Sequence, residues 1–492
     1  GSLVASNILE FNKWQHIVAT VDADGNGRIY KNGLLWAGGV INAPLNVVRT
    51  SNFIGRSNWP EAYYAGGYDE AAIYDQVLSS DRIAQHFYAG MGRGATLDRG
   101  NATGGAYVFE LNDADGVTMS NLSITGAFDG IFISNGSTLF TLQNSIVYEN
   151  ANSGLNLTDA ASNRPTIKDN LFYGDVSAGE NRNQNYGVYI RGQDPTVLRN
   201  QAYHTNGSQQ FGIYLDNVGA NVVVRDNLVF NNSDTGLWVT AVSFEASGNV
   251  AFNNNRGFYY DDNNGALVAH VHDDLAYNNT TGFELRGAGE YYNLTAHDNG
   301  TGFYAPANAL SGTVHDIASW RNSTGINWQG GALQRARTYG NFGTGLYLGY
   351  GNWNVSGVVS YDNYTGIHSQ SYHGDNTIAN NLVYDNRDRG ALLENVQSSN
   401  GTLYFTNNTV MELNADVLEI TGTSKNVQVK NNILWSGGTG HYVISVANTA
   451  QGRELGDLFE YRFGTSVTVK KSESAMLPFL QQKIGARKLL IY

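Results

Sequence analysis

The sequence predicts an all-β chain whose main part is a right-handed parallel β-helix of about 13 coils. Three observations predict this fold. A glycine followed by alternating apolar residues recurs along the chain at spacings of 20 to 33 residues. Between successive glycines lies a second alternating segment that ends in an asparagine-rich turn, as at residues 222–232. The 58 glycines and only 6 prolines suit many tight turns and strands,.

The glycine-led segments are the first element of each coil. They begin at Gly130, Gly154, Gly187, Gly212, Gly236, Gly257, Gly282, Gly302, Gly325, Gly345, Gly366 and Gly390. Two short strands per coil cannot bury their apolar faces alone, and stacking the coils gives them one continuous core. We expect each leading glycine to provide a positive φ for a sharp turn. A propeller would need about four strands in a unit of about 40 residues, which this period does not allow.

This stretch of about 350 residues resembles the right-handed β-helix repeats of the pectate-lyase-like superfamily. The resemblance rests on the glycine-led strands and on asparagine-rich turns such as residues 380–386. It implies the fold and leaves the activity open, because the superfamily contains pectin and alginate lyases, glycoside hydrolases, sugar epimerases, phage tailspikes and adhesins.

The two ends of the chain differ from the repeat, which we place at residues 93–450. Residues 1–92 contain a Trp-His strand from Trp14, a turn at residues 24–27 and an Asp-Glu strand around Asp69. These features resemble the second half of a laminin-G-like, concanavalin-A-like jelly roll. The resemblance implies a partial β-sandwich that acts as a spacer, a cap or a glycan binder. Residues 451–492 fit neither strand period and are expected to form a C-terminal cap or tail.

Composition limits the function. The formal net charge of −13 argues against nucleic acid as a partner,. No apolar run is long enough for a membrane span, and the absence of cysteine excludes disulfides and thiolate metal sites,. We predict no metal site and no certain cofactor, which leaves room for a calcium ion. The composition fits a secreted or cell-surface protein, bacterial in type, although this chain shows no export signal,.

Outward-facing residues of the glycine-led strands form columns, because parallel rungs repeat at about 4.8 Å. We expect residues one and three after each glycine to face the core and residues two and four to face outward. The column at position two is Phe132, Asn156, Tyr189, Tyr214, Trp238, Tyr259, Glu284, Tyr304, Asn327, Tyr347, His368 and Leu392. The column at position four is Ser134, Thr158, Arg191, Asp216, Thr240, Asp261, Arg286, Pro306, Gln329, Gly349, Gln370 and Glu394.

Aromatic residues flanked by arginine and carboxylate residues are the ingredients of a carbohydrate site. Pyranose C–H faces pack on aromatic rings, and sugar hydroxyls pair with carboxylate and guanidinium groups. We therefore predict a polysaccharide or cell-surface glycan as the partner. The predicted binding residues are Tyr189, Arg191, Tyr214, Trp238, Tyr259, Arg286, Tyr304, Asn327, Tyr347 and His368. The alternative is that these aromatic residues are simply good strand formers or lie under a loop.

Paired carboxylates are the candidates for catalysis. Asp216, Asp261 and Glu284 lie on nearby rungs, at separations that suit either a retaining or an inverting glycosidase,. We therefore predict a polysaccharide-degrading glycoside hydrolase. The alternatives are a lyase or epimerase that recruits residues such as Tyr259 or His368, and a non-catalytic glycan-binding adhesin or stalk. Ion pairing of the carboxylates with Arg191 and Arg286 is the structural alternative for these residues.

One further column is expected to be structural. It comprises Asn144, Asn170, Asn200, Asn227, Asn249, Asp274, Asp316, Asn381, Asn408 and Asn432. Stacked amides can hydrogen-bond from coil to coil, and asparagine tolerates left-handed turns.

Overall fold

The computed structural model has two compact units, residues 1–95 and 96–492. In the first unit the structure describes residues 14–41, 53–56, 63–78 and several shorter pieces. In the second it describes residues 96–447 apart from 175–183, 205–208, 263–268, 308, 371–373, 395–400 and 423–425. The predicted cap or tail at 451–492 lies outside the described residues.

The first unit contains a three-stranded antiparallel sheet in the order β1-β2-β3. Its strands are β1 (Ile17–Val21), β2 (Asn26–Lys31) and β3 (Leu34–Val40). The Asp22 carboxylate accepts hydrogen bonds from the main-chain N–H groups of Asp24 and Asn26, which holds the β1–β2 turn. Residues 68–74, predicted as a strand, form none; their side chains are exposed, and they do not pair with the described strands of this sheet.

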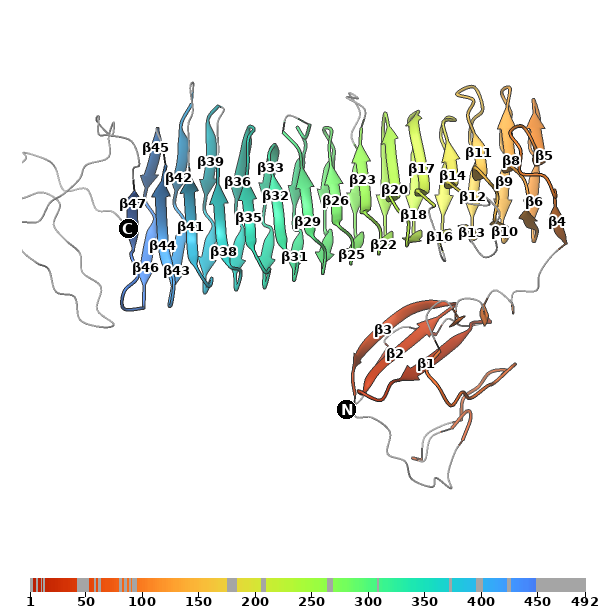
Figure 1. Cartoon of the computed structure of the whole chain (residues 1–492), viewed down its shortest axis with the longest axis horizontal. Coiled ribbons are helices and arrows are strands. Elements are labelled where there is room, and N and C mark those ends of the chain that lie inside the picture. The colour runs from red at the N-terminus through yellow and green to blue at the C-terminus, as the bar shows by residue number, and fades with distance from the viewer. Residues whose placement is uncertain are drawn as a thin grey trace, which may run out of the picture. The chain divides into compact units, whose positions relative to one another are not determined.

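The second unit is a parallel β-helix, which confirms the predicted fold (Figure 1). Its sheets hold 15, 14 and 15 strands, close to the coil number expected. We call them sheets 1, 2 and 3, in the order in which each coil visits them. Sheet 1 contains the glycine-led strands: β5 (Tyr107–Asn112), β8 (Asp129–Ser134), β11 (Ser153–Leu157), β14 (Tyr186–Ile190), β17 (Phe211–Val218), β20 (Thr235–Ala241), β23 (Arg256–Asp261), β26 (Thr281–Leu285), β29 (Thr301–Ala305), β32 (Thr324–Trp328), β35 (Thr344–Leu348), β38 (Thr365–Ser369), β41 (Arg389–Glu394), β44 (Asp416–Thr421) and β47 (Ile444–Ala447).

Sheets 2 and 3 are built from shorter strands. Sheet 2 contains β6 (Thr118–Ser120), β9 (Thr141–Gln143), β12 (Thr166–Lys168), β15 (Thr196–Leu198), β18 (Val222–Arg225), β21 (Phe244–Ser247), β24 (His270–His272), β27 (Glu290–Tyr292), β30 (Thr313–His315), β33 (Gly331–Gln334), β36 (Trp353–Ser356), β39 (Asn376–Ala379), β42 (Leu403–Thr406) and β45 (Val427–Lys430). Sheet 3 contains β4 (Thr96–Asp98), β7 (Ser123–Thr125), β10 (Ile146–Tyr148), β13 (Leu171–Gly174), β16 (Gln201–His204), β19 (Leu228–Phe230), β22 (Val250–Phe252), β25 (Leu275–Tyr277), β28 (Thr295–His297), β31 (Ala318–Trp320), β34 (Arg337–Tyr339), β37 (Val359–Tyr361), β40 (Leu382–Tyr384), β43 (Thr409–Glu412) and β46 (Ile433–Ser436).

Each coil therefore has three strands, and the prediction of two was wrong. The segment at 222–230, expected as one strand, is β18 followed by β19. Asp226 lies between them with φ 57°, in the left-handed region that asparagine and aspartate tolerate,. This residue turns the chain through a corner too short to be recognised from the alternation of apolar residues.

The reason given for the leading glycines was also wrong. None of them has a positive φ; that conformation belongs mainly to corner residues such as Asn231 and Asn253. The glycines are required because there is no room for a side chain. A Cβ on Gly282 would lie 2.5 Å from the carbonyl oxygen of Gly302 and 3.2 Å from the Asn299 amide nitrogen.

An amide ladder runs along the corner between sheets 2 and 3, as predicted. The Asn227 side chain donates to Asn249 Oδ1 (3.0 Å), and Asn249 in turn donates to Asp274 Oδ1 (3.1 Å). The ladder includes Asn170, Asn200, Asn227, Asn249 and Asp274, and a second stretch holds Asn381, Asn408 and Asn432. Asn144 and Asp316 are not members: they are corner residues with positive φ, and Asp316 pairs with Arg335.

A longer ladder, not predicted, follows the corner between sheets 3 and 1. Its members are Asn150, Gln184, Gln209, Asn232, Asn254, Asn279, Asn299, Asn322, Asn341, Asn363, Asn386 and Glu412. Most of the asparagines also donate to a main-chain carbonyl, as Asn299 does to Ala276 (3.1 Å). These buried amides are thereby satisfied, which is the condition under which polar groups are tolerated in a core.

Candidate functional site

The column predicted at position two of the sheet 1 strands exists in the structure. Residues of the position-two column are register partners on successive strands, from Phe132 to Leu392. Residues one and three after each glycine are buried, as Ile213 and Leu215 are in β17. The pleat of a parallel strand therefore presents the predicted binding residues on one continuous outer face.

Six aromatic rings form a cluster on four consecutive rungs of this face. They are Tyr186, Tyr189, Phe211, Tyr214, Trp238 and Tyr259. Some of the rings are stacked, as Tyr186 is on Phe211, and others are inclined: Tyr189 meets Tyr214 edge to face, and Tyr214 is tilted by 51° from Trp238. Trp238 and Tyr259 are stacked, with ring centroids 3.8 Å apart. We call these six residues the aromatic cluster.

Tyr259 contributes differently from what the sequence predicted. Its ring is covered by Trp238, and the guanidinium groups of Arg256 and Arg286 each lie 5.3 Å from its centroid. Only 8% of the residue is exposed. Tyr259 therefore supports Trp238 and the arginines, and its ring face is not open to a sugar.

Glu284 is held by two arginines. Its carboxylate lies 2.9 Å from Arg256 Nε and 2.7 Å from Arg286 Nη2, and its side chain is 6% exposed. This double pairing positions the two guanidinium groups.

Asp216 lies at the other end of the aromatic cluster and is also engaged. It accepts hydrogen bonds from Tyr189 Oη (3.0 Å) and from the Asn217 amide (2.9 Å), and Arg191 Nε lies 3.5 Å away. Burial, together with the charge of Asp216, raises the pKa of Tyr189, and the same two causes raise that of Tyr214 to about 12. Both phenols are therefore protonated at neutral pH, and Tyr189 donates its hydrogen bond to Asp216.

Asp261 lies beside Arg286 and follows Tyr260 on β23. Its carboxylate accepts a hydrogen bond from Tyr259 Oη (3.2 Å). The structure thus places Glu284, Asp261, Arg286 and Tyr259 in one group, while Asp216 lies with Tyr189 and Arg191 two rungs away.

The remaining predicted residues continue the face toward the C-terminus. Tyr347 donates to Gln370 Oε1 (2.9 Å), and Gln370 donates to Glu394 (2.8 Å). His368 Nε2 lies 2.9 Å from Glu394, and burial lowers the pKa of this histidine. Asn327 accepts from the Gln329 amide (3.1 Å), and Tyr304 is its partner in register on β29. This part of the face is polar and carries few charges.

Sequence reasoning missed one column of this face. Strict alternation would bury the residue before each glycine. In several strands this residue is partly exposed, as Tyr186 in β14 and Arg256 in β23 are, whereas Ser153, Thr235 and Thr365 are buried. That position supplies Tyr186 and Phe211 to the aromatic cluster and Arg256 to the group around Glu284. It then supplies a row of threonines on successive strands, Thr281, Thr301, Thr324, Thr344 and Thr365. The repeated Thr-Gly pair in the sequence was the available signal.

A second set of rings was also missed. Eleven aromatic rings stack nearly in parallel on the outside of sheet 3, from Tyr148 to Tyr384. Interplanar angles of 4° to 18° mean that each ring covers its neighbour's face. These rings offer mainly their edges to a ligand, so we interpret them as a stabilising stack and not as a sugar platform.

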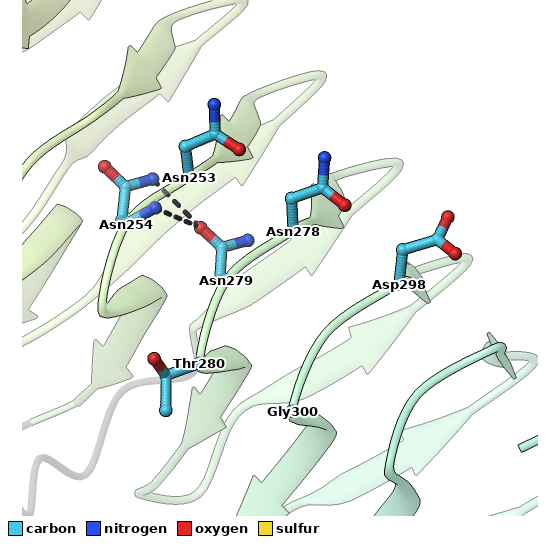
Figure 2. A pocket seen from close by; sticks show the side chains of 7 residues that line it. All are labelled: Asn253, Asn254, Asn278, Asn279, Thr280, Asp298 and Gly300. Atoms are coloured by element: carbon cyan, nitrogen blue, oxygen red, sulfur yellow. Dashed lines mark hydrogen bonds between the residues drawn. The ribbon is translucent and has the colours of Figure 1, made fainter. Parts of the chain in front are cut away.

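One hollow in the described part of the chain lies away from the face of sheet 1. It is an open depression at the corner between sheets 3 and 1, lined by Asn253, Asn254, Asn278, Asn279, Thr280, Asp298 and Gly300 (Figure 2). Figure 2 shows Asn254 donating to Asn279, both of which belong to the second amide ladder. The amides of Asn254 and Asn279 are thus part of the fold's ladder, and we place the site on sheet 1.

Among the described residues, no group of three or more histidine, aspartate or glutamate side chains is arranged to hold a metal ion. The described residues also include no helix long and apolar enough to cross a membrane.

Comparison with known families agrees with this architecture. The family model described as the right handed beta helix region matches residues 56–180, 175–300 and 308–452, and the chain belongs to this family. The model of the concanavalin A-like lectin/glucanases superfamily, laminin-G type, matches residues 2–84. No curated protein matches the chain.

Solved structures show only a loose likeness. One is the A-module of the mannuronan C-5 epimerase AlgE6 of Azotobacter vinelandii, with 14% identity, 77% of this chain and 97% of that chain covered, and a TM-score of 0.28. Another is a mutant tailspike protein of E. coli bacteriophage HK620 in complex with a pentasaccharide, with 12% identity, 74% and 76% covered, and a TM-score of 0.27. Likeness at these TM-scores carries no inference about the site.

Proposed function

We propose that this protein binds a glycan along the outer face of sheet 1. The observation that supports this most is the aromatic cluster, bounded at both ends by guanidinium–carboxylate pairs, Arg191–Asp216 and Arg286–Glu284. Inclined rings expose parts of their faces to pyranose C–H groups, and the paired charges offer donors and acceptors to hydroxyls. The match of the first unit to a superfamily of lectins and glucanases is compatible with a carbohydrate partner.

The binding proposal is tested with two aromatic variants and one matched control. Tyr214→Ala and Trp238→Ala should each weaken binding to the best ligand of a polysaccharide panel by about two- to tenfold, since one aromatic contact is worth about 0.5–1.5 kcal/mol. Tyr339→Ala removes a ring from the stack on sheet 3 and should leave affinity unchanged. Equal losses in all three variants, or no binding by the wild type, would refute the proposal.

A glycoside hydrolase remains a second proposal, with Asp216, Asp261 and Glu284 as the acid/base candidates. Asp261 favours it, because its carboxylate lies close to a second carboxylate and to Arg286 in the same group. The engagement of Glu284 by two arginines favours binding over catalysis. Release of reducing ends that Asp261→Ala abolishes would support hydrolysis, and ultraviolet-absorbing products would support a lyase. Full activity of both Asp261→Ala and Glu284→Ala would remove these residues from the mechanism.

We also propose that the protein acts outside the cell, where polysaccharides and surface glycans are found.

A further inference from the structure

The arginines of the sheet 1 face all have carboxylate partners. Arg191 pairs with Asp216, and both Arg256 and Arg286 pair with Glu284. Farther along, Arg389 lies 2.7 Å from Asp388 and 2.6 Å from Glu419. No lysine occurs in the described strands of sheet 1. Each of these arginines therefore has an anion beside it, and the described strands of sheet 1 contain no other arginine or lysine.

Carboxylates outnumber these arginines on the same face. The outward carboxylates are Glu110, Asp216, Asp261, Glu284, Glu394 and Glu419. His368 adds no positive charge at neutral pH, because burial lowers its pKa. The negative field of a chain with net charge −13 is thus not reversed locally at the aromatic cluster,.

The C-terminal part of the face contains uncharged hydrogen-bonding groups. From Thr301 to Gln370 the outward positions hold threonine hydroxyls, the phenols of Tyr304 and Tyr347, and the amides of Asn327, Gln329 and Gln370. Hydroxyls and amides both donate and accept, which matches the hydrogen-bonding character of a sugar hydroxyl.

We propose that the glycan recognised by sheet 1 is uncharged, a neutral hexose or pentose polymer and not one that carries uronate or sulfate groups. This inference rests on the proposed glycan-binding function. An anionic sugar would have to displace Asp216 or Glu284 from its arginines and would then lie among the remaining carboxylates. A neutral sugar accepts and donates hydrogen bonds at the same pairs without breaking them.

The test compares neutral and anionic ligands of matched length on the full chain, for example a glucan oligosaccharide and an oligogalacturonate. The wild type should bind the best neutral oligosaccharide at least tenfold more tightly than any anionic one, with affinity nearly independent of salt between about 20 and 150 mM. An anionic ligand that binds as tightly as the neutral one would overturn the inference while the glycan-binding function stood. Failure of both ligand classes would instead refute that function.

A second test uses a variant that removes the carboxylate partner of one arginine. Asp216→Asn frees Arg191, whose side chain is 49% exposed, and should increase binding of the oligogalacturonate at least fivefold in low salt,. Asp169→Asn is the matched control, because it frees Arg199 at the corner between sheets 2 and 3, away from the aromatic cluster. Circular dichroism checks that both variants are folded. No gain in Asp216→Asn, or an equal gain in the control, would overturn the inference.

Discussion

Asp274 should make the protein less stable as the pH rises toward neutrality. It terminates the first amide ladder, where its carboxylate accepts from the Asn249 main-chain N–H (2.6 Å) and from Tyr260 Oη (2.7 Å). The equivalent position in the next coil is Leu294, which provides no acceptor, so an acceptor-only group suits the end of the ladder. Burial raises the pKa of Asp274 to about 7. The hydrogen bonds from Tyr260 and Asn249 lower this pKa, but their effect is smaller than that of burial.

The sign and size of the effect follow from linkage. Below pH 3.8 the carboxyl is protonated in both the folded and the unfolded chain, and its contribution to stability is complete. Between 3.8 and about 7 the unfolded chain ionises first, so the contribution falls, and it is lost once the pH passes the folded pKa,. A difference of about 3 pKa units corresponds to a loss of about 4 kcal/mol at most.

Urea unfolding between pH 4 and 8, followed by far-ultraviolet circular dichroism, measures this loss. Asp274→Asn removes the titration and keeps the Oδ1 acceptor for Asn249, although its Nδ2 can no longer accept the hydrogen bond from Tyr260 Oη,. This variant should flatten the curve by up to about 4 kcal/mol. Asp316→Asn is the control, because Arg335 and His315 lower the pKa of Asp316 to about 2, below the tested range. Wild type and Asp274→Asn curves that run parallel from pH 4 to 8 would refute the reasoning.

Three further changes test the packing of the coils by urea unfolding. Gly282→Ala places a Cβ against a carbonyl oxygen and should cost about 1–3 kcal/mol, whereas Gly104→Ala, with no atom within 4 Å, should be neutral,. Asn299→Ala removes the acceptor of the Asn279 amide and should cost about 3 kcal/mol, and a loss under about 1 kcal/mol would show that water replaces the ladder,. Phe283→Ala empties a fully buried ring position and should cost about 3–5 kcal/mol, and a neutral result would contradict close packing there,.

The fold and one face of the site could be predicted because they follow a repeat. Each glycine marks the same register position, so the sequence alone assigns residues as distant along the chain as Tyr189 and Trp238 to one column. The amide ladder through Asn227 was predicted for the same reason.

What could not be predicted depends on local departures from alternation. The corner at Asp226 divides one expected strand into two, and the turn of Arg256 to the outside brings it to Glu284. Neither departure is visible as a change in apolar spacing. Tyr259 is covered by Trp238, and Glu284 is paired with Arg256, and both of these partners come from a neighbouring coil.

The second amide ladder has a direction, and that direction makes the coil an interchangeable module. From Asn232 to Asn386 every rung receives the same donors from the coil before it and offers the same donors to the coil after it. A coil duplicated or deleted in this interval leaves each amide with a partner, so the length of sheet 1 can change by whole rungs. Glu412, which accepts from Asn386 and offers no donor onward in its ionised form, marks where such lengthening must stop.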